Sequence, residues 1–166
     1  AGSEVVQTNT FVASPLHLRM AGRDADNTRS IVSSGVRLAK DAIMGSSRSI
    51  YISGSMGPSP GAIETDAGDT SFGIPNHQVR ESHRIVAETL AEEGGDLRCI
   101  ETMFSATEAT IAVDEARAFN LPIAVNLTLK YTRDRRTGRT VYRTDWGHSP
   151  GDLLDFLASG RYASNG

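Results

Sequence analysis

The feature that most constrains the fold of this chain is a regular alternation between short apolar runs rich in β-branched residues and longer segments with helical periodicity. The short runs predict four strands, at residues 5–10, 50–55, 97–102 and 123–128. Helices are expected between and after them, at residues 15–20, 26–44, 77–93, 105–119 and from 150 onward. This order is typical of parallel strands joined by helical crossovers.

The alternation fits two architectures, an open doubly wound sheet and part of an eight-stranded barrel. Four strands cannot close such a barrel, so on the barrel interpretation the chain is a piece of one. We expect an α/β fold, a single partial barrel domain over residues 1–166. In either architecture the active site lies at the carboxyl ends of the strands.

The composition is that of an ordinary globular protein, with 39% hydrophobic and 22% charged residues in a chain of 166. A formal net charge of -3 gives no global field that attracts nucleic acid or an anionic membrane, which favours small-molecule chemistry. The single Cys99 cannot form an internal disulfide, and no stretch approaches the roughly 20 apolar residues that span a bilayer. Since no secretion signal is evident, we expect a soluble, cytoplasmic protein.

Two connecting segments stand out. Residues 56–75 form a long connection, which we interpret as a functional cover rather than a disordered segment. Residues 133–143 surround Thr137-Gly138 and indicate either a mobile turn or a hairpin. The arginines at 133, 135, 136, 139 and 143 are able to bind an anion, but the overall acidity and the lack of interleaved aromatic residues favour a solvated turn.

Glu101 is the most informative polar residue. A carboxylate at the end of an apolar strand needs a cation, a proton donor or solvent to offset its desolvation. By strand alternation it shares a face with Leu97 and Cys99, which points it into the barrel mouth. Two interpretations stay open: a carboxylate that binds a ligand, and a structural one held by an arginine or a helix N-terminus.

The first strand ends in successive hydrogen-bonding side chains, those of Gln7, Thr8, Asn9 and Thr10. On a half-buried strand they need a ligand or neighbouring strands to satisfy them. A plug of side-chain hydrogen bonds is the simpler interpretation from the residues alone. Phe11, which follows them, is either a pocket wall or part of the core.

Other kinds of site are disfavoured. The glycine-rich residues 54–61 lack the spacing of a phosphate-binding loop. The four histidines are dispersed without metal-ligand spacing, and we expect most of them at the surface. Cys99 is expected to act as a small buried hydrophobe, and no Ser/His/Asp arrangement has a local signature.

Four motifs follow one another along nearly the whole chain. They are residues 2–11, ending in Gln7-Thr8-Asn9-Thr10-Phe11; Gly54-Ser55-Met56-Gly57-Pro58; Gly95-Asp96-Leu97 with Ile100-Glu101-Thr102-Met103-Phe104; and Gly138-Arg139-Thr140. In this order they resemble the homocysteine S-methyltransferase family. The resemblance implies a (βα)8 TIM barrel of which this chain holds about strands 2 to 5, with their helices.

The resemblance also implies a reaction, in which the zinc-bound thiolate of homocysteine attacks a methyl group on a donor. Zinc lowers the pKa of the thiol and keeps its sulfur deprotonated. Glu101 would hold the ammonium group of the substrate, and Thr8, Asn9, Thr10 and Phe11 would line the pocket near its amino-acid backbone. Homocysteine and a methyl donor are therefore the implied partners.

The chain departs from the family pattern in its cysteines. Those that bind zinc in the family follow the sixth and eighth strands, and Cys99 lies at neither place. Because one cysteine cannot make a three-thiolate site, we expect that the isolated chain binds no catalytic zinc and transfers no methyl group. Two alternatives remain: a non-catalytic module whose partial barrels associate as a homo-oligomer through exposed strand edges, and a component of a corrinoid-linked methyltransferase.

Overall fold

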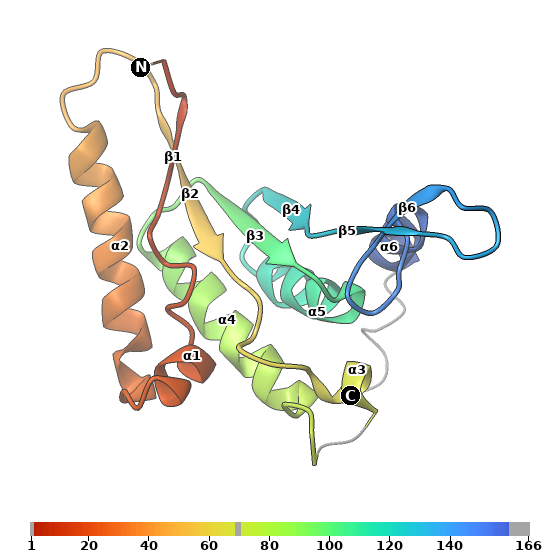
Figure 1. Ribbon diagram of the computed structural model, residues 1–166. Helices are drawn as coiled ribbons and strands as arrows, with labels where there is room; N and C mark the ends of the chain where they lie inside the picture. Colours follow the sequence, from red (N-terminus) through yellow and green to blue (C-terminus); the bar gives the residue numbers. More distant parts are fainter. Residues whose placement is uncertain (1, 69–70, 160–166) are drawn as a thin grey trace.

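The computed structural model describes residues 2–68 and 71–159, and a parallel four-stranded sheet lies at its centre (Figure 1). The strands are β1 (Val5–Gln7), β2 (Tyr51–Met56), β3 (Leu97–Met103) and β4 (Ile123–Leu127). Their order in the sheet, β1-β2-β3-β4, follows the chain, and each pairs in parallel with the next. A strand order without reversal is that of a barrel segment rather than a doubly wound sheet. The predicted α/β fold with parallel strands is confirmed.

Helices follow the strands much as the sequence predicted. They are α1 (Pro15–Met20), a 3-10 turn η1 (Ala25–Asn27), α2 (Thr28–Ile43), α3 (Glu64–Ala67), α4 (Asn76–Glu92), α5 (Ala106–Arg117) and α6 (Pro150–Ser159). The predicted helix at 26–44 begins instead with the turn η1, because the side chain of Asp24 accepts a hydrogen bond from Asp26 N at 3.0 Å. Within the described ranges, no helix is both long and apolar enough to cross a bilayer.

The core lies between the sheet and α2, α4 and α5, which are arranged along one side of it (Figure 1). Ile100 and Met103 of β3 face this side and are fully buried against Val86 and Leu90 of α4. Burial alternates from Leu97 to Glu101, so every second residue of this stretch points to the opposite face, where it is half-buried, and the alternation breaks at the exposed Thr102. That opposite face carries Leu97, Cys99 and Glu101, as the sequence predicted.

One buried residue of β3 is charged. Arg98 has 0% exposure on the core side of the strand, where its Nε and Nη2 donate to the Ala87 carbonyl oxygen at 3.2 and 2.9 Å. Its guanidinium carbon lies 5.3 Å from the centre of the Phe119 ring. Burial lowers the pKa of Arg98. A carbonyl of α4 and an aromatic face thus offset part of the desolvation of this cation, whose Nη1 is buried without a hydrogen-bond partner among the described residues.

The first strand is shorter than predicted. Residues 5–10 were expected to be extended, but β1 ends at Gln7. Thr8 N still donates to Ser53 O at 2.9 Å, after which the chain turns toward α1. The ladder ends here because the Thr10 hydroxyl, and not its backbone, bonds the neighbouring strand, at 2.7 Å from Ser55 O.

The long connection at 56–75 has structure of its own. It contains α3 and an isolated bridge between Ile63 and Ile74. Ile63 is 1% exposed and packs with Val79 of α4 and Ile111 of α5. This connection is therefore anchored on two helices; a role as a cover stays a prediction, and residues 69–70 lie outside the described part.

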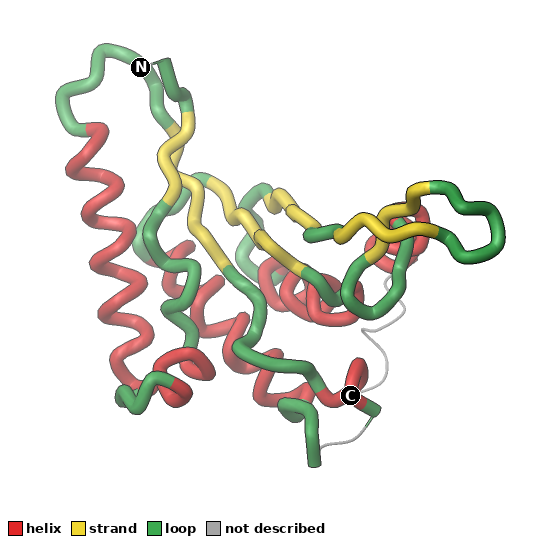
Figure 2. The backbone as a smooth tube through the Cα atoms, in the orientation of Figure 1, coloured by secondary structure: helices red, strands yellow, loops and turns green. Residues whose placement is uncertain are grey.

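A two-stranded antiparallel sheet forms a separate unit after β4. It pairs β5 (Lys130–Arg133) with β6 (Thr140–Arg143) and projects from the body of the molecule (Figure 2). Of the two possibilities for residues 133–143, the hairpin is the one found. Helix α6 follows, and its start is capped as predicted, since Asp152 N donates to Ser149 Oγ at 3.2 Å and Ser149 N donates to Asp152 Oδ2 at 2.7 Å.

Candidate functional site

Polar side chains from three strands meet on the face of the sheet opposite the core. The Glu101 carboxylate, from β3, accepts hydrogen bonds at one oxygen from Gln7 Nε2 of β1 and from Ser55 Oγ of β2, the latter at 2.5 Å. Among residues 2–68 and 71–159, no cation pairs with Glu101. Its charge is therefore balanced by an amide and a hydroxyl alone, which leaves it able to accept a cationic group from a ligand.

The end of β3 is irregular directly after Glu101. The register with β4 shifts between Ile100 and Met103, and Thr102 has a φ of 61°. A left-handed backbone is rare for a β-branched residue, and such positions cluster at functional sites. The shift places a bulge at the carboxyl end of the strand, which is the end where ligands bind in this architecture.

Thr8 and Thr10 are satisfied by the protein itself. Ser55 N donates to Thr8 Oγ1 at 2.9 Å, and the two threonine hydroxyls lie 2.7 Å apart. Since the Thr10 hydroxyl donates to Ser55 O, the Thr8 hydroxyl donates to Thr10 Oγ1. Both threonines are buried. Of the two interpretations of this run, the structure favours the plug of side-chain hydrogen bonds for Thr8 and Thr10.

Asn9 and Phe11 lie on different sides of that plug. Asn9 is exposed and sits beside α2, where a Cβ atom added to Gly35 would come within 3.0 Å of its Oδ1. Phe11 is half-buried and lies against Gly57, at which a Cβ would be 2.6 Å from Phe11 O. The missing side chains at Gly35 and Gly57 thus let α2 and β2 approach this segment closely.

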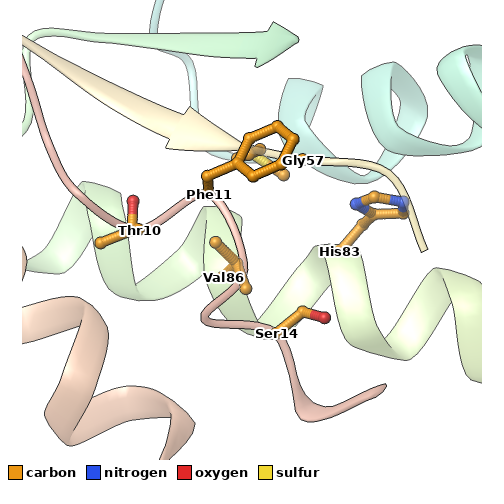
Figure 3. Close-up of a pocket in the computed structure, with 7 residues that line it drawn as sticks. Thr10, Phe11, Ser14, Gly57, His83 and Val86 are labelled. Atoms are coloured by element: carbon orange, nitrogen blue, oxygen red, sulfur yellow. The ribbon is translucent and has the colours of Figure 1, made fainter. Parts of the chain in front are cut away.

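A small pocket opens beside Phe11, with Thr10, Ser14, Met56, Gly57, His83 and Val86 as its other walls (Figure 3). It joins the segment after β1, the end of β2 and the helix α4. Ser14 caps α1, and its Oγ is 2.9 Å from His17 Nδ1. Burial lowers the pKa of His17, so this imidazole is neutral at pH 7.

The pocket also borders a buried acid–imidazole pair that the sequence did not reveal. His83 Nε2 lies 3.0 Å from Glu108 Oε1, and the two side chains are 4% and 1% exposed. Glu108 also accepts from Ser59 N at 2.6 Å. The expectation that most histidines lie at the surface is wrong, since His83 is buried, His17 and His148 are half-buried and only His77 is exposed. The sequence pattern at residues 105–108, a capping box, predicts that the side chains of Ser105 and Glu108 both cap α5. Only Ser105 does so, since Glu108 N donates to Ser105 Oγ at 3.0 Å, and the Glu108 carboxylate points to the β2–α3 connection instead.

The described residues do not fit a zinc site. No three His, Cys, Asp or Glu side chains among them lie close enough together to hold a metal ion. Burial, and to a lesser degree the Glu101 carboxylate, raise the pKa of the Cys99 thiol. A metal ligand needs the thiolate, so the surroundings of Cys99 oppose that role.

Comparison with known proteins gives the same family that the motifs suggested. Residues 1–149 match the family model described as Homocysteine S-methyltransferase. No curated protein sequence matches the chain at a significant level. Among solved structures, the homocysteine methyltransferase MmuM from Escherichia coli superposes in its metallated form with a TM-score of 0.68 at 19% identity, and in its apo form with 0.66 at 18%. These superpositions cover 97% of this chain but only 56% and 54% of MmuM, so the chain spans about half the length of that protein.

Proposed function

Because the chain belongs to the homocysteine S-methyltransferase family, we propose that it forms the part of the barrel that binds the amino-acid end of homocysteine. In this proposal Glu101 accepts the substrate ammonium group. Gln7 and Ser55 hold the Glu101 carboxylate in place. Phe11 forms a wall nearby, and Thr8, Asn9 and Thr10 shape the segment that carries it.

The observation that carries the proposal is the environment of Glu101. Its carboxylate lies at the carboxyl end of β3, and both of its hydrogen bonds from the protein go to Oε1. Among the described residues Oε2 has no hydrogen-bond partner. An ammonium group supplies both the missing charge and the missing donors. A structural glutamate held by an arginine would have its cation already.

We propose further that this chain, which spans about half the length of MmuM, belongs to a protein that transfers a methyl group from a donor to the thiol of homocysteine. Zinc in such an enzyme lowers the pKa of the bound thiol. The described residues supply no metal site, so on this proposal the isolated chain binds the amino acid and does not catalyse the transfer. Which compound serves as the methyl donor, a corrinoid protein being one option, depends in this proposal on residues outside this site.

Titration calorimetry with L-homocysteine tests the proposal. We expect weak binding that Glu101→Gln reduces about tenfold or more, since it removes the charge from an ammonium contact. Glu81→Gln, on the exposed face of α4, is the matched control and should leave the affinity unchanged. 4-Mercaptobutyrate, which lacks the ammonium group, should not compete. Equal affinity of the Glu101→Gln and Glu81→Gln variants would refute the assignment.

One observation favours a second function, assembly. The four-stranded sheet has β1 and β4 at its edges, and among the described residues no further strand pairs with either edge. If partial barrels join at these edges as a homo-oligomer, the chain should associate in a concentration-dependent way. Sedimentation equilibrium checks it, and a monomer at every concentration would exclude it.

A further inference from the structure

The positive charge of the chain is concentrated in the hairpin. We call residues 130–143 the basic arm. They hold six of the 17 Lys and Arg residues and one of the 20 acidic residues, so the rest of the chain has a formal net charge of -8. A strongly basic segment on an acidic body is an electrostatic feature that the amino-acid site does not use.

Four of these cations have no acidic partner within the described part of the chain. Lys130 pairs with Asp145 at 2.7 Å, and Arg143 Nη1 lies 3.7 Å from Asp152 Oδ2. The other four arginines are exposed, and their guanidinium groups have no side-chain or carbonyl partner within the described residues. They are Arg133, Arg135, Arg136 and Arg139. The tip of the arm therefore presents its charge to solvent.

The arm also presents two aromatic rings. Tyr131 and Tyr142 are 79% and 57% exposed and stand directly opposite each other in the β5–β6 register. Arg133 lies two residues after Tyr131, so its side chain is on the same face. The arginine cluster has no aromatic residues interleaved in its sequence, but the hairpin places these two tyrosines beside it. Tyr and Arg are the side chains that most often dominate protein–protein interfaces.

The tip of the arm is preformed. The Asp134 carboxylate accepts from Arg136 N at 3.1 Å, and from Thr137 N and Thr137 Oγ1, each at 2.7 Å. These bonds lower the pKa of Asp134, so this carboxylate stays ionised and its hydrogen bonds stay within the turn. Gly138 continues the turn with a φ of 68°. An arm already held in shape loses little conformational entropy when it binds.

We propose that the basic arm docks onto an acidic surface of a partner protein. The segment of the partner that binds is rich in Asp and Glu, with apolar side chains between them. Its carboxylates pair with the four exposed arginines, and its apolar groups pack on Tyr131 and Tyr142. Nucleic acid fits less well, because a long polyanion that follows the arm also approaches a body of net charge -8. A compact acidic patch meets the arm alone.

Two synthetic peptides of equal length and charge test the proposal, one alternating Glu with Leu and one alternating Glu with Ser. We expect the chain to bind the Glu/Leu peptide more tightly, with an affinity that falls between about 50 and 200 mM salt. R133Q/R135Q/R136Q/R139Q should weaken binding about tenfold or more. R19Q/R23Q/R37Q/R84Q removes the same charge from exposed positions on the body and should not.

The tyrosines give the sharper readout. Y131S/Y142S should abolish the preference for Leu over Ser while leaving the salt dependence unchanged. The amide NMR signals of Thr137 and Gly138 show whether the turn survives in this variant, and if it does not, the arginine variant decides. Equal losses in the two arginine variants would overturn the proposal, as would tighter binding of single-stranded DNA than of either peptide. So would salt-sensitive self-association without peptide binding, which would assign the arm to a second copy of the chain.

Discussion

Glu108 of α5 accepts a hydrogen bond at 2.6 Å from the backbone N–H of Ser59, which lies in the connection after β2. The same carboxylate oxygen contacts His83 of α4. One buried acid therefore ties two helices to the segment that follows the Gly57 wall of the pocket. The pocket wall at His83 is therefore held by a carboxylate that does not itself line the pocket.

Glu108→Ala should destabilise the fold strongly. The change leaves Ser59 N and His83 Nε2 buried without their acceptor, and losing a buried charged partner costs about 2–5 kcal/mol. Urea unfolding followed by circular dichroism measures this loss. Glu81→Ala on the exposed face of α4 is the control, for which we expect less than about 0.5 kcal/mol. Similar values for the two variants would mean that the Glu108 contacts contribute little.

Gly35→Ala should destabilise the contact between α2 and the Thr10 segment. An added Cβ would lie 2.6 Å from Thr10 Cγ2, which forces the packed elements apart at about 1–3 kcal/mol, more than the gain in helix propensity. Gly151→Ala in α6 provides the comparison, since its Cβ would come no closer than 3.7 Å to Ser149 Oγ. Thermal unfolding should show a lower Tm for the first variant and an equal or higher Tm for the second.

Thr102→Gly should stabilise the chain by up to about 1 kcal/mol, because glycine adopts a φ of 61° without the steric cost that a β-branched residue bears. Thr102→Ala keeps most of that cost and should change the free energy of unfolding less. Thr102→Pro, whose ring fixes φ near -65°, should disrupt the end of β3. Loss of stability in the glycine variant would show that the threonine side chain makes a contact worth more than the strain.

Stability should fall as the pH is lowered below about 6.5, the ordinary pKa of histidine. Burial lowers the pKa of His17 in the folded chain, so the unfolded chain binds a proton more readily. The contribution of His17 is therefore fully present above pH 6.5 and declines until the pH reaches the folded pKa. Urea unfolding at several pH values should show this decline, and His17→Asn should reduce its slope. An unchanged slope would assign the pH dependence to other groups.

The sequence predicted most of the fold and part of the site. Short apolar runs rich in β-branched residues and segments with helical period located the strands and helices, and alternation along β3 was sufficient to place Glu101 opposite Ile100. Alternation works here because it depends only on neighbours in the same strand. The predicted extent of the first strand was wrong, because β1 ends at Gln7, where the hydroxyls of two threonines bond to Ser55, far along the chain.

The contacts that could not be predicted from the sequence are those between separate helices and strands. His83 and Glu108 are 25 residues apart, and neither neighbourhood indicates that a buried pair will form. Tyr131 and Tyr142 flank the turn, and only the hairpin register brings them opposite each other. Polar and aromatic partners of this kind depend on how elements meet, which residue patterns within one element do not encode.

The strands β5 and β6 pair only with each other among the described residues, so no ladder of the central sheet runs through them. Insertions, deletions or charge reversals between Arg133 and Thr140 leave the alignment of β1 to β4 untouched. The hairpin is thus mechanically uncoupled from the barrel strands: a load or a distortion at its tip reaches the central sheet only through the segments that connect the two.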